Sequence, residues 1–92
     1  MKIFCQIYKS VRNTEMYLYV DKTRGLVDVP AALMKRFGDP SELMILILEP
    51  GKKLARANVD DVMREIADKG FYLQMPPTAA ELYRREGSDK NA

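Results

Sequence analysis

Tyrosine side chains recur in three segments of the chain that have the alternating pattern of β-strands. Tyr17 and Tyr19 share one side of the segment 16–20, because successive strand residues point to opposite faces. We expect one candidate binding face on the sheet, made of Tyr8, Tyr17, Tyr19, Tyr72 and Gln74, with Gln6 among them. If the last helix covers only part of this face, the rings could stack on single-stranded nucleic acid or a peptide. Tyrosines that pack beneath helices with their hydroxyls in water give the same pattern, and we favour that interpretation.

A basic segment precedes the best helix pattern in the chain. Lys52, Lys53 and Arg56 lead to Asn58, a residue suited to begin a helix. Cationic side chains beside a helix N-terminus can hold a phosphate, in a nucleotide, an RNA or a metabolite. However, no glycine-rich phosphate loop precedes the helix, and two aspartates in its first turn compete for the same dipole. We therefore favour a solvated charged loop over a phosphate site.

The acidic, sulfur and hydroxyl side chains form no catalytic constellation. Glu42 and Glu49 bracket one strand and lie roughly 20 Å apart at about 3.3 Å per residue, too far to share a substrate. The chain has no histidine, so its serines lack their usual general base, and a transition-metal site is not expected. Cys5 lies in an apolar strand pattern, which predicts that it is buried and acts as a small hydrophobic side chain. We predict no catalytic residue, no metal, no cofactor and no enzymatic activity.

The elements that must position these residues are arranged around the apolar run Leu43–Leu48. Six consecutive apolar residues indicate a strand covered on both faces, because a half-exposed strand would alternate. The run is too short to cross a membrane, which takes roughly 20 apolar residues. We therefore predict that it is the central strand of the sheet.

The other elements follow from periodicity and from their flanking residues. The first two predicted strands should form an antiparallel hairpin, and helical connections favour parallel neighbours, so we predict a mixed sheet of about four strands. The fold class is α/β (α+β), an α/β/α sandwich with the order ββαβαβα. The expected elements are strands 3–8, 16–20, 43–48 and 71–75, helices between Pro30 and Gly38 and between Asn58 and Gly70, a short extended piece at 26–29, and a last helix starting at Thr78 with a capping box.

An ordered set of segments in this chain is typical of one protein family. The segments are Phe4–Tyr8, Thr14–Val20, Val29–Pro30, Leu33–Met34, Phe37–Gly38, Met44–Leu46, Lys52–Ala55 and Gly70–Pro77. With them the chain resembles the YcgL family of small bacterial proteins, from about Ile3 to Arg85. The resemblance implies a compact α/β/α sandwich with a mixed sheet, and it implies no reaction, cofactor or catalytic residue.

Length and charge limit the remaining possibilities. Ninety-two residues make one domain, which we place at residues 1–86, followed by a flexible polar tail at 87–92. A net charge of +2 is far below that of an obligate nucleic-acid binder. We expect a cytoplasmic, monomeric accessory domain that binds a partner protein without membrane contact. The alternative is an RNA- or nucleotide-binding module that uses the tyrosine face and the basic segment.

Overall fold

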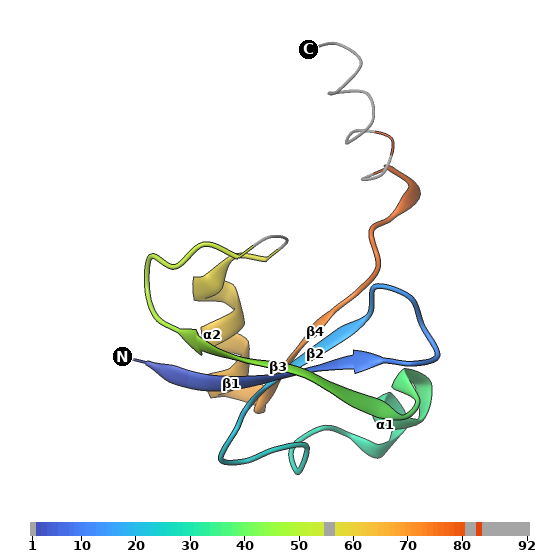
Figure 1. The fold of residues 1–92 in the computed structure, drawn as a ribbon, viewed down its shortest axis with the longest axis horizontal. Helices are drawn as coiled ribbons and strands as arrows, with labels where there is room; N and C mark the ends of the chain where they lie inside the picture. The colour runs from blue at the N-terminus through green and yellow to red at the C-terminus, as the bar shows by residue number, and fades with distance from the viewer. Residues whose placement is uncertain (1, 55–56, 81–82, 84–92) are drawn as a thin grey trace.

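A computed structural model describes residues 2–54, 57–80 and 83. The elements follow one another along the chain as two strands, a helix, a strand, a helix and a strand (Figure 1). Their bounds are β1 Ile3–Ser10, β2 Tyr17–Asp21, α1 Ala31–Phe37, β3 Pro40–Leu48, α2 Val59–Lys69 and β4 Phe71–Gln74. The predicted element order is confirmed over these residues. The predicted last helix and the boundary at residue 86 fall largely or wholly outside the described residues, as does the tail at 87–92.

The four strands form one sheet in the order β3-β1-β2-β4. The predicted β1–β2 hairpin is confirmed, with Ile7 opposite Tyr19. β1 also pairs antiparallel with β3, and β2 pairs antiparallel with β4. The prediction of a mixed sheet is therefore wrong for these strands. The connection through α1 leads from β2 to β3 at one edge of the sheet, and the connection through α2 leads from β3 to β4 at the other edge. Each edge strand runs antiparallel to its neighbour, so these four strands form no parallel pair.

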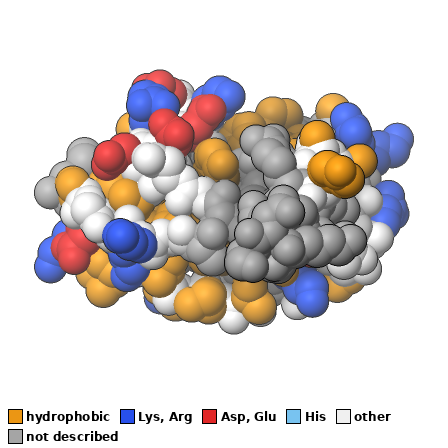
Figure 2. Space-filling view, turned by 90° about the horizontal axis from the view of Figure 1, so that it is seen from above, with side chains coloured by type: hydrophobic (Ala, Val, Ile, Leu, Met, Phe, Trp, Pro, Cys, Tyr) orange, Lys and Arg blue, Asp and Glu red, His pale blue; other side chains and the backbone are white. Residues whose placement is uncertain are grey.

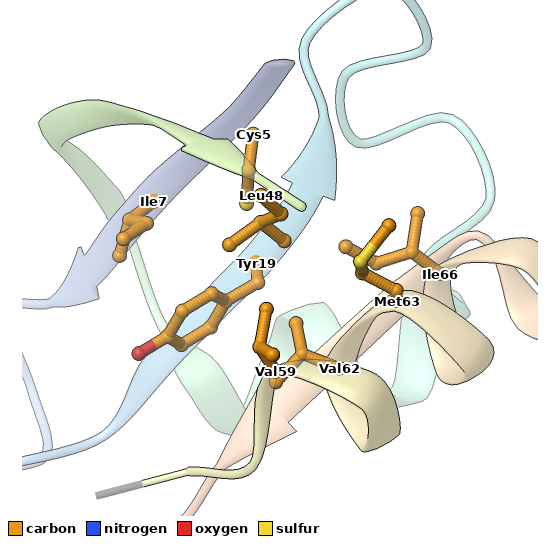
Figure 3. Packing of buried hydrophobic residues seen from close by; sticks show 8 residues of the cluster. All are labelled: Cys5, Ile7, Tyr19, Leu48, Val59, Val62, Met63 and Ile66. Carbon is orange, nitrogen blue, oxygen red and sulfur yellow. The ribbon is translucent and has the colours of Figure 1, made fainter. Parts of the chain in front are cut away.

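Helices cover the two faces of the sheet separately, as the sandwich prediction requires. α2 directs one apolar stripe at Cys5, Tyr19 and Leu48 (Figure 3). On the opposite face, Phe37 of α1 packs against Leu18 and Val20 of β2. The stripe of α2 consists of Val59, Val62, Met63 and Ile66, which are the residues expected from the helical period.

Local sequence signals explain where α2 begins and ends. The Asn58 side chain accepts hydrogen bonds from the backbone N–H groups of Asp60 and Asp61, at 2.9 and 3.1 Å. Gly70 ends the helix with a φ of +93°, in the left-handed region that favours glycine. β4 begins at the next residue, so this glycine fixes the direction of the last strand relative to α2. The segment 26–29 forms turns instead of the expected extended piece.

The apolar run is the main correction to the sequence prediction. β3 is an edge strand, with β1 as its only neighbour in the described sheet. The side chains of Leu43, Met44, Ile45 and Ile47 are between 40 and 50% exposed. β1 is instead covered on both faces, with Cys5, Gln6 and Ile7 all buried. An unbroken apolar run therefore marks an exposed edge in this fold, because the two helices lie over the other strands.

Candidate functional site

The structure brings three of the predicted tyrosines together beneath α2. Tyr19 lies opposite Tyr72 in the β2–β4 pair, and their rings meet edge-on with centroids 5.6 Å apart. Tyr17 lies opposite Gln74 on the same face. The Tyr19 hydroxyl donates a 2.8 Å hydrogen bond to Oε1 of Gln74. Because Tyr19 is only 8% exposed, its ring faces are already occupied and a nucleic-acid base cannot stack on it.

Tyr8 and Gln6 lie on the other face of the sheet, so the prediction of one shared face is wrong for them. Tyr8 is opposite Leu18 and packs in the cluster that contains Phe37. The Gln6 side chain is buried and donates hydrogen bonds to the carbonyl oxygens of Met44, at 3.0 Å, and Ile7, at 3.3 Å. These bonds lie where the β1–β3 register shifts after Ile7. Gln6 thus satisfies backbone groups at an irregularity of the ladder.

The basic segment lies in the connection between β3 and α2. Lys53 forms an isolated β-bridge with Asn58, and Lys52 donates its backbone N–H to the carbonyl of Glu49. Arg56 lies outside the described residues. In the first turn of α2, the backbone N–H groups of Asp60 and Asp61 already donate to the Asn58 side chain. The described part of this segment therefore places two lysines near the start of α2, but two of the helix N–H groups that could bind a phosphate already have a partner within the protein.

Two of the described carboxylates form ion pairs with arginines close by in the chain. Asp61 pairs with Arg64 one turn along α2, and Arg24 pairs with Asp28 at 2.6 Å. The hydrogen bond from Arg24 lowers the pKa of the Asp28 carboxyl below its usual value. Within the described residues, no group of three His, Cys, Asp or Glu side chains could hold a metal ion.

Cys5 is buried in the cluster beneath α2, and burial raises the pKa of its thiol to about 12. A cysteine in the unfolded chain has a pKa of about 8.5. Because the folded state favours the protonated thiol, the contribution of Cys5 to the free energy of unfolding is fully present below that pH. That stability is lost as the pH rises from about 8.5 towards 12. We expect a disulfide reagent at pH 8 to leave the folded protein unmodified and to label Cys5 fully after unfolding in guanidinium. Rapid labelling without denaturant would contradict this buried placement.

Sequence reasoning missed two surface features that involve β3. The first is the outer edge of that strand, where Ile45 and Ile47 are exposed on the α1 face beside Phe4 of the neighbouring strand β1. Figure 2, which looks down on the molecule from above the view of Figure 1, shows hydrophobic side chains at the surface next to charged ones. The second is a hollow of about 310 Å³ on the α2 face. The segment 3–8 has apolar residues on both of its faces, and this sequence feature is compatible with the inner position of β1.

Comparison with known proteins identifies the family. The model of the YcgL domain matches residues 5–77 of this chain. The chain belongs to the YcgL family. A YcgL domain-containing protein of Chromohalobacter salexigens is 56% identical over 79 residues, which cover 86% of this chain and 81% of that protein.

Two further YcgL relatives show the same extent of similarity. The protein of Cellvibrio japonicus is 49% identical over 84% of this chain and 79% of its own length. That of Saccharophagus degradans is 45% identical over 91% of this chain and 92% of its own length. Their names state the YcgL domain and no enzymatic activity. Across the described part of this YcgL domain, no helix combines the length and apolar character needed to span a bilayer.

Proposed function

We propose that this YcgL domain is a non-enzymatic module that binds a partner protein by adding an extended segment of that partner to the outer edge of β3. One observation carries the proposal: the most apolar strand of the chain lies at the edge of the sheet, and Leu43, Met44, Ile45 and Ile47 of this strand are 40–50% exposed. Long apolar edge strands are sites of strand addition, in which main-chain hydrogen bonds supply affinity. We also propose a cytoplasmic location, for which the unpaired buried Cys5 is the supporting feature.

The ladder defines which backbone groups of β3 are available. Lys22 donates its N–H to the carbonyl of Phe4, so the even-numbered residues of β1 bond to β2 and the odd-numbered ones to β3. Cys5 lies opposite Leu46. Leu46 therefore directs its N–H and carbonyl inward to β1, whereas Ile45 and Ile47 direct theirs to the outside. These outward groups are the donors and acceptors that an added strand would use.

The side chains and charges around this edge favour a particular kind of partner segment. Ile45 and Ile47 form an apolar row on the α1 face with Phe4, which is 55% exposed. Glu42 and Glu49 stand exposed at the two ends of the row. We infer that the partner segment is apolar at its centre and basic at its ends, since those charges would complement the two glutamates.

A second copy of this chain fits the edge less well. Antiparallel pairing of two β3 strands centred on Ile45 or Leu46 brings Glu42 of each copy near Glu49 of the other. Two carboxylates then gather at each end of the pair, and the single Lys2 ammonium 3.9 Å from Glu49 offsets only one of them, which disfavours association. The proposal therefore commits to a different protein as the occupant.

Proline substitutions test this proposal, because they remove one backbone donor at a time. Decapeptides selected from a displayed random library against the domain serve as the probe. Ile45→Pro removes an outward N–H and should weaken peptide binding at least tenfold while the domain stays folded, since proline is tolerated on edge strands. Leu46→Pro is the matched control: it removes a bond to β1 and should unfold the domain.

The position of the bound peptide gives the second readout. Hydrogen exchange should slow at the amides of Ile45 and Ile47 when the selected peptide binds. Unchanged binding to Ile45→Pro, or protection confined to another surface, would overturn the proposal. Sedimentation that detects a dimer of the free chain, abolished by Ile45→Pro, would instead assign the edge to a second copy.

The RNA- or nucleotide-binding alternative is the weaker proposal. It keeps the support of Lys52 and Lys53, but Tyr19 is buried and Tyr8 lies on the opposite face. We expect an oligouridine titration at about 50 mM salt to show no micromolar binding. A micromolar affinity that falls steeply when salt is raised to about 200 mM, and that is lost in the double variant Lys52→Glu, Lys53→Glu, would reverse this ranking.

A further inference from the structure

The hollow on the α2 face is a separate feature from the outer edge of β3. It lies over the inner part of the sheet, and its volume of about 310 Å³ is at the lower end of the range for small-molecule sites. Leu54, from the connection between β3 and α2, is one of its walls. The full lining is Ile7, Glu15, Tyr17, Tyr19, Leu43, Met44, Leu46, Leu54 and Gln74.

One buried polar side chain in this lining has an unused donor. Gln74 is 8% exposed, and its Oε1 accepts the hydrogen bond from the Tyr19 hydroxyl. Its amide nitrogen donates no hydrogen bond to the residues that the structure describes. Among those residues, no fully buried polar side-chain atom lacks a partner, so this nitrogen must reach accessible space. Gln74 is one of the residues that line the hollow, so the hollow is an accessible space next to this side chain.

The charge of the lining restricts what the hollow can hold. Glu15 is its one charged residue among those described, and its backbone has a φ of +59°. The remaining lining is aliphatic or aromatic apart from Gln74. Within the described lining, an anionic ligand would therefore meet a carboxylate and no cation, whereas an ammonium group would be attracted.

We propose that the hollow binds a small neutral or cationic molecule that has a flat apolar body and a carbonyl oxygen. The apolar body lies against Ile7, Leu46 and Leu54, and the carbonyl accepts a hydrogen bond from the Gln74 amide nitrogen. A cationic group on the ligand pairs with Glu15. This site does not depend on strand addition at β3, although Leu43, Met44 and Leu46 belong to that strand.

Four aromatic probes separate the contributions of the carbonyl and the charge. Phenylalaninamide carries both a carbonyl and an ammonium group, phenylacetamide only the carbonyl, phenethylamine only the ammonium, and phenylacetate a carboxylate. Titrations followed by ¹H–¹⁵N spectra should shift the Gln74 side-chain amide, with millimolar affinities that are ordinary for ligands of this size. Phenylalaninamide should bind tightest, and phenylacetate at least tenfold more weakly.

Two substitutions assign these contributions to residues. Gln74→Met should weaken phenylacetamide and phenylalaninamide about tenfold and leave phenethylamine unchanged. Glu15→Gln should weaken the two ammonium probes about threefold and leave phenylacetamide unchanged. Equal affinity for all four probes, or shifts that avoid the hollow, would overturn the proposal. If Gln74→Met does not fold, the order of the four probes and the Glu15→Gln variant still decide it.

Discussion

Replacing Phe37 by alanine will lower the free energy of unfolding by about 3–5 kcal/mol. Phe37 is fully buried at the end of α1 and is the largest such side chain in the described core. It packs against Leu18 and Val20, the inner residues of β2, so truncation leaves a cavity between the helix and the sheet. Urea unfolding followed by circular dichroism measures the loss.

Phe4 supplies the matched control for this prediction. It is the same side-chain type on the same face of the sheet, but it is 55% exposed at the edge beside β3. Phe4→Ala should therefore change the free energy of unfolding by less than about 1 kcal/mol. Equal losses for the two variants would show that α1 does not cover the sheet as described.

Replacing Gly70 by alanine will cost about 2–4 kcal/mol, from two independent causes. The residue has a φ of +93°, which L side chains rarely adopt. An added Cβ would also lie 2.4 Å from the Cβ of Asp28, a contact that cannot form without displacement. Asp28 is held by Arg24, so the obstruction is not a free side-chain end.

Gly25→Ala is the control that distinguishes the cost of the backbone conformation from the cost of the steric overlap. Its φ is +61°, yet an added Cβ would meet nothing within 4 Å. Gly25→Ala should thus cost only about 1 kcal/mol. Both variants can be compared by thermal unfolding at the same pH. A loss at Gly70 no larger than that at Gly25 would contradict the close packing of Asp28 on the α2–β4 junction.

The misassigned strand shows what a pattern of apolar residues leaves undetermined. The run Leu43–Leu48 is equally compatible with a buried inner strand and with an edge strand whose side chains are partly exposed. The burial of this run depends on which strands the helices cover. That depends in turn on how the connections place the helices over the sheet. Gln6 illustrates the converse, because this polar residue is buried in the inner strand, where the carbonyl of Met44 accepts its hydrogen bond.

The tyrosine face shows the same limit at the level of register. Alternation correctly separates Tyr8 from Ile7 and groups Tyr17 with Tyr19. It does not say which side of β1 matches which side of β2, since a shift of one residue exchanges the faces. The pairing of Ile7 with Tyr19 settles this and moves Tyr8 to the α1 face.

The amino-acid sequence alone determined the four strands, the helices α1 and α2, the order of these elements, the cap and apolar stripe of α2 and the family, because these depend on neighbouring residues and on similarity along the chain. Only the tertiary structure decided that β3 lies at the edge, that all described strand pairs are antiparallel and that Gln74 lines a hollow beside Leu54. Those properties arise from contacts between residues far apart in sequence, and local periodicity carries no information about which distant segments meet.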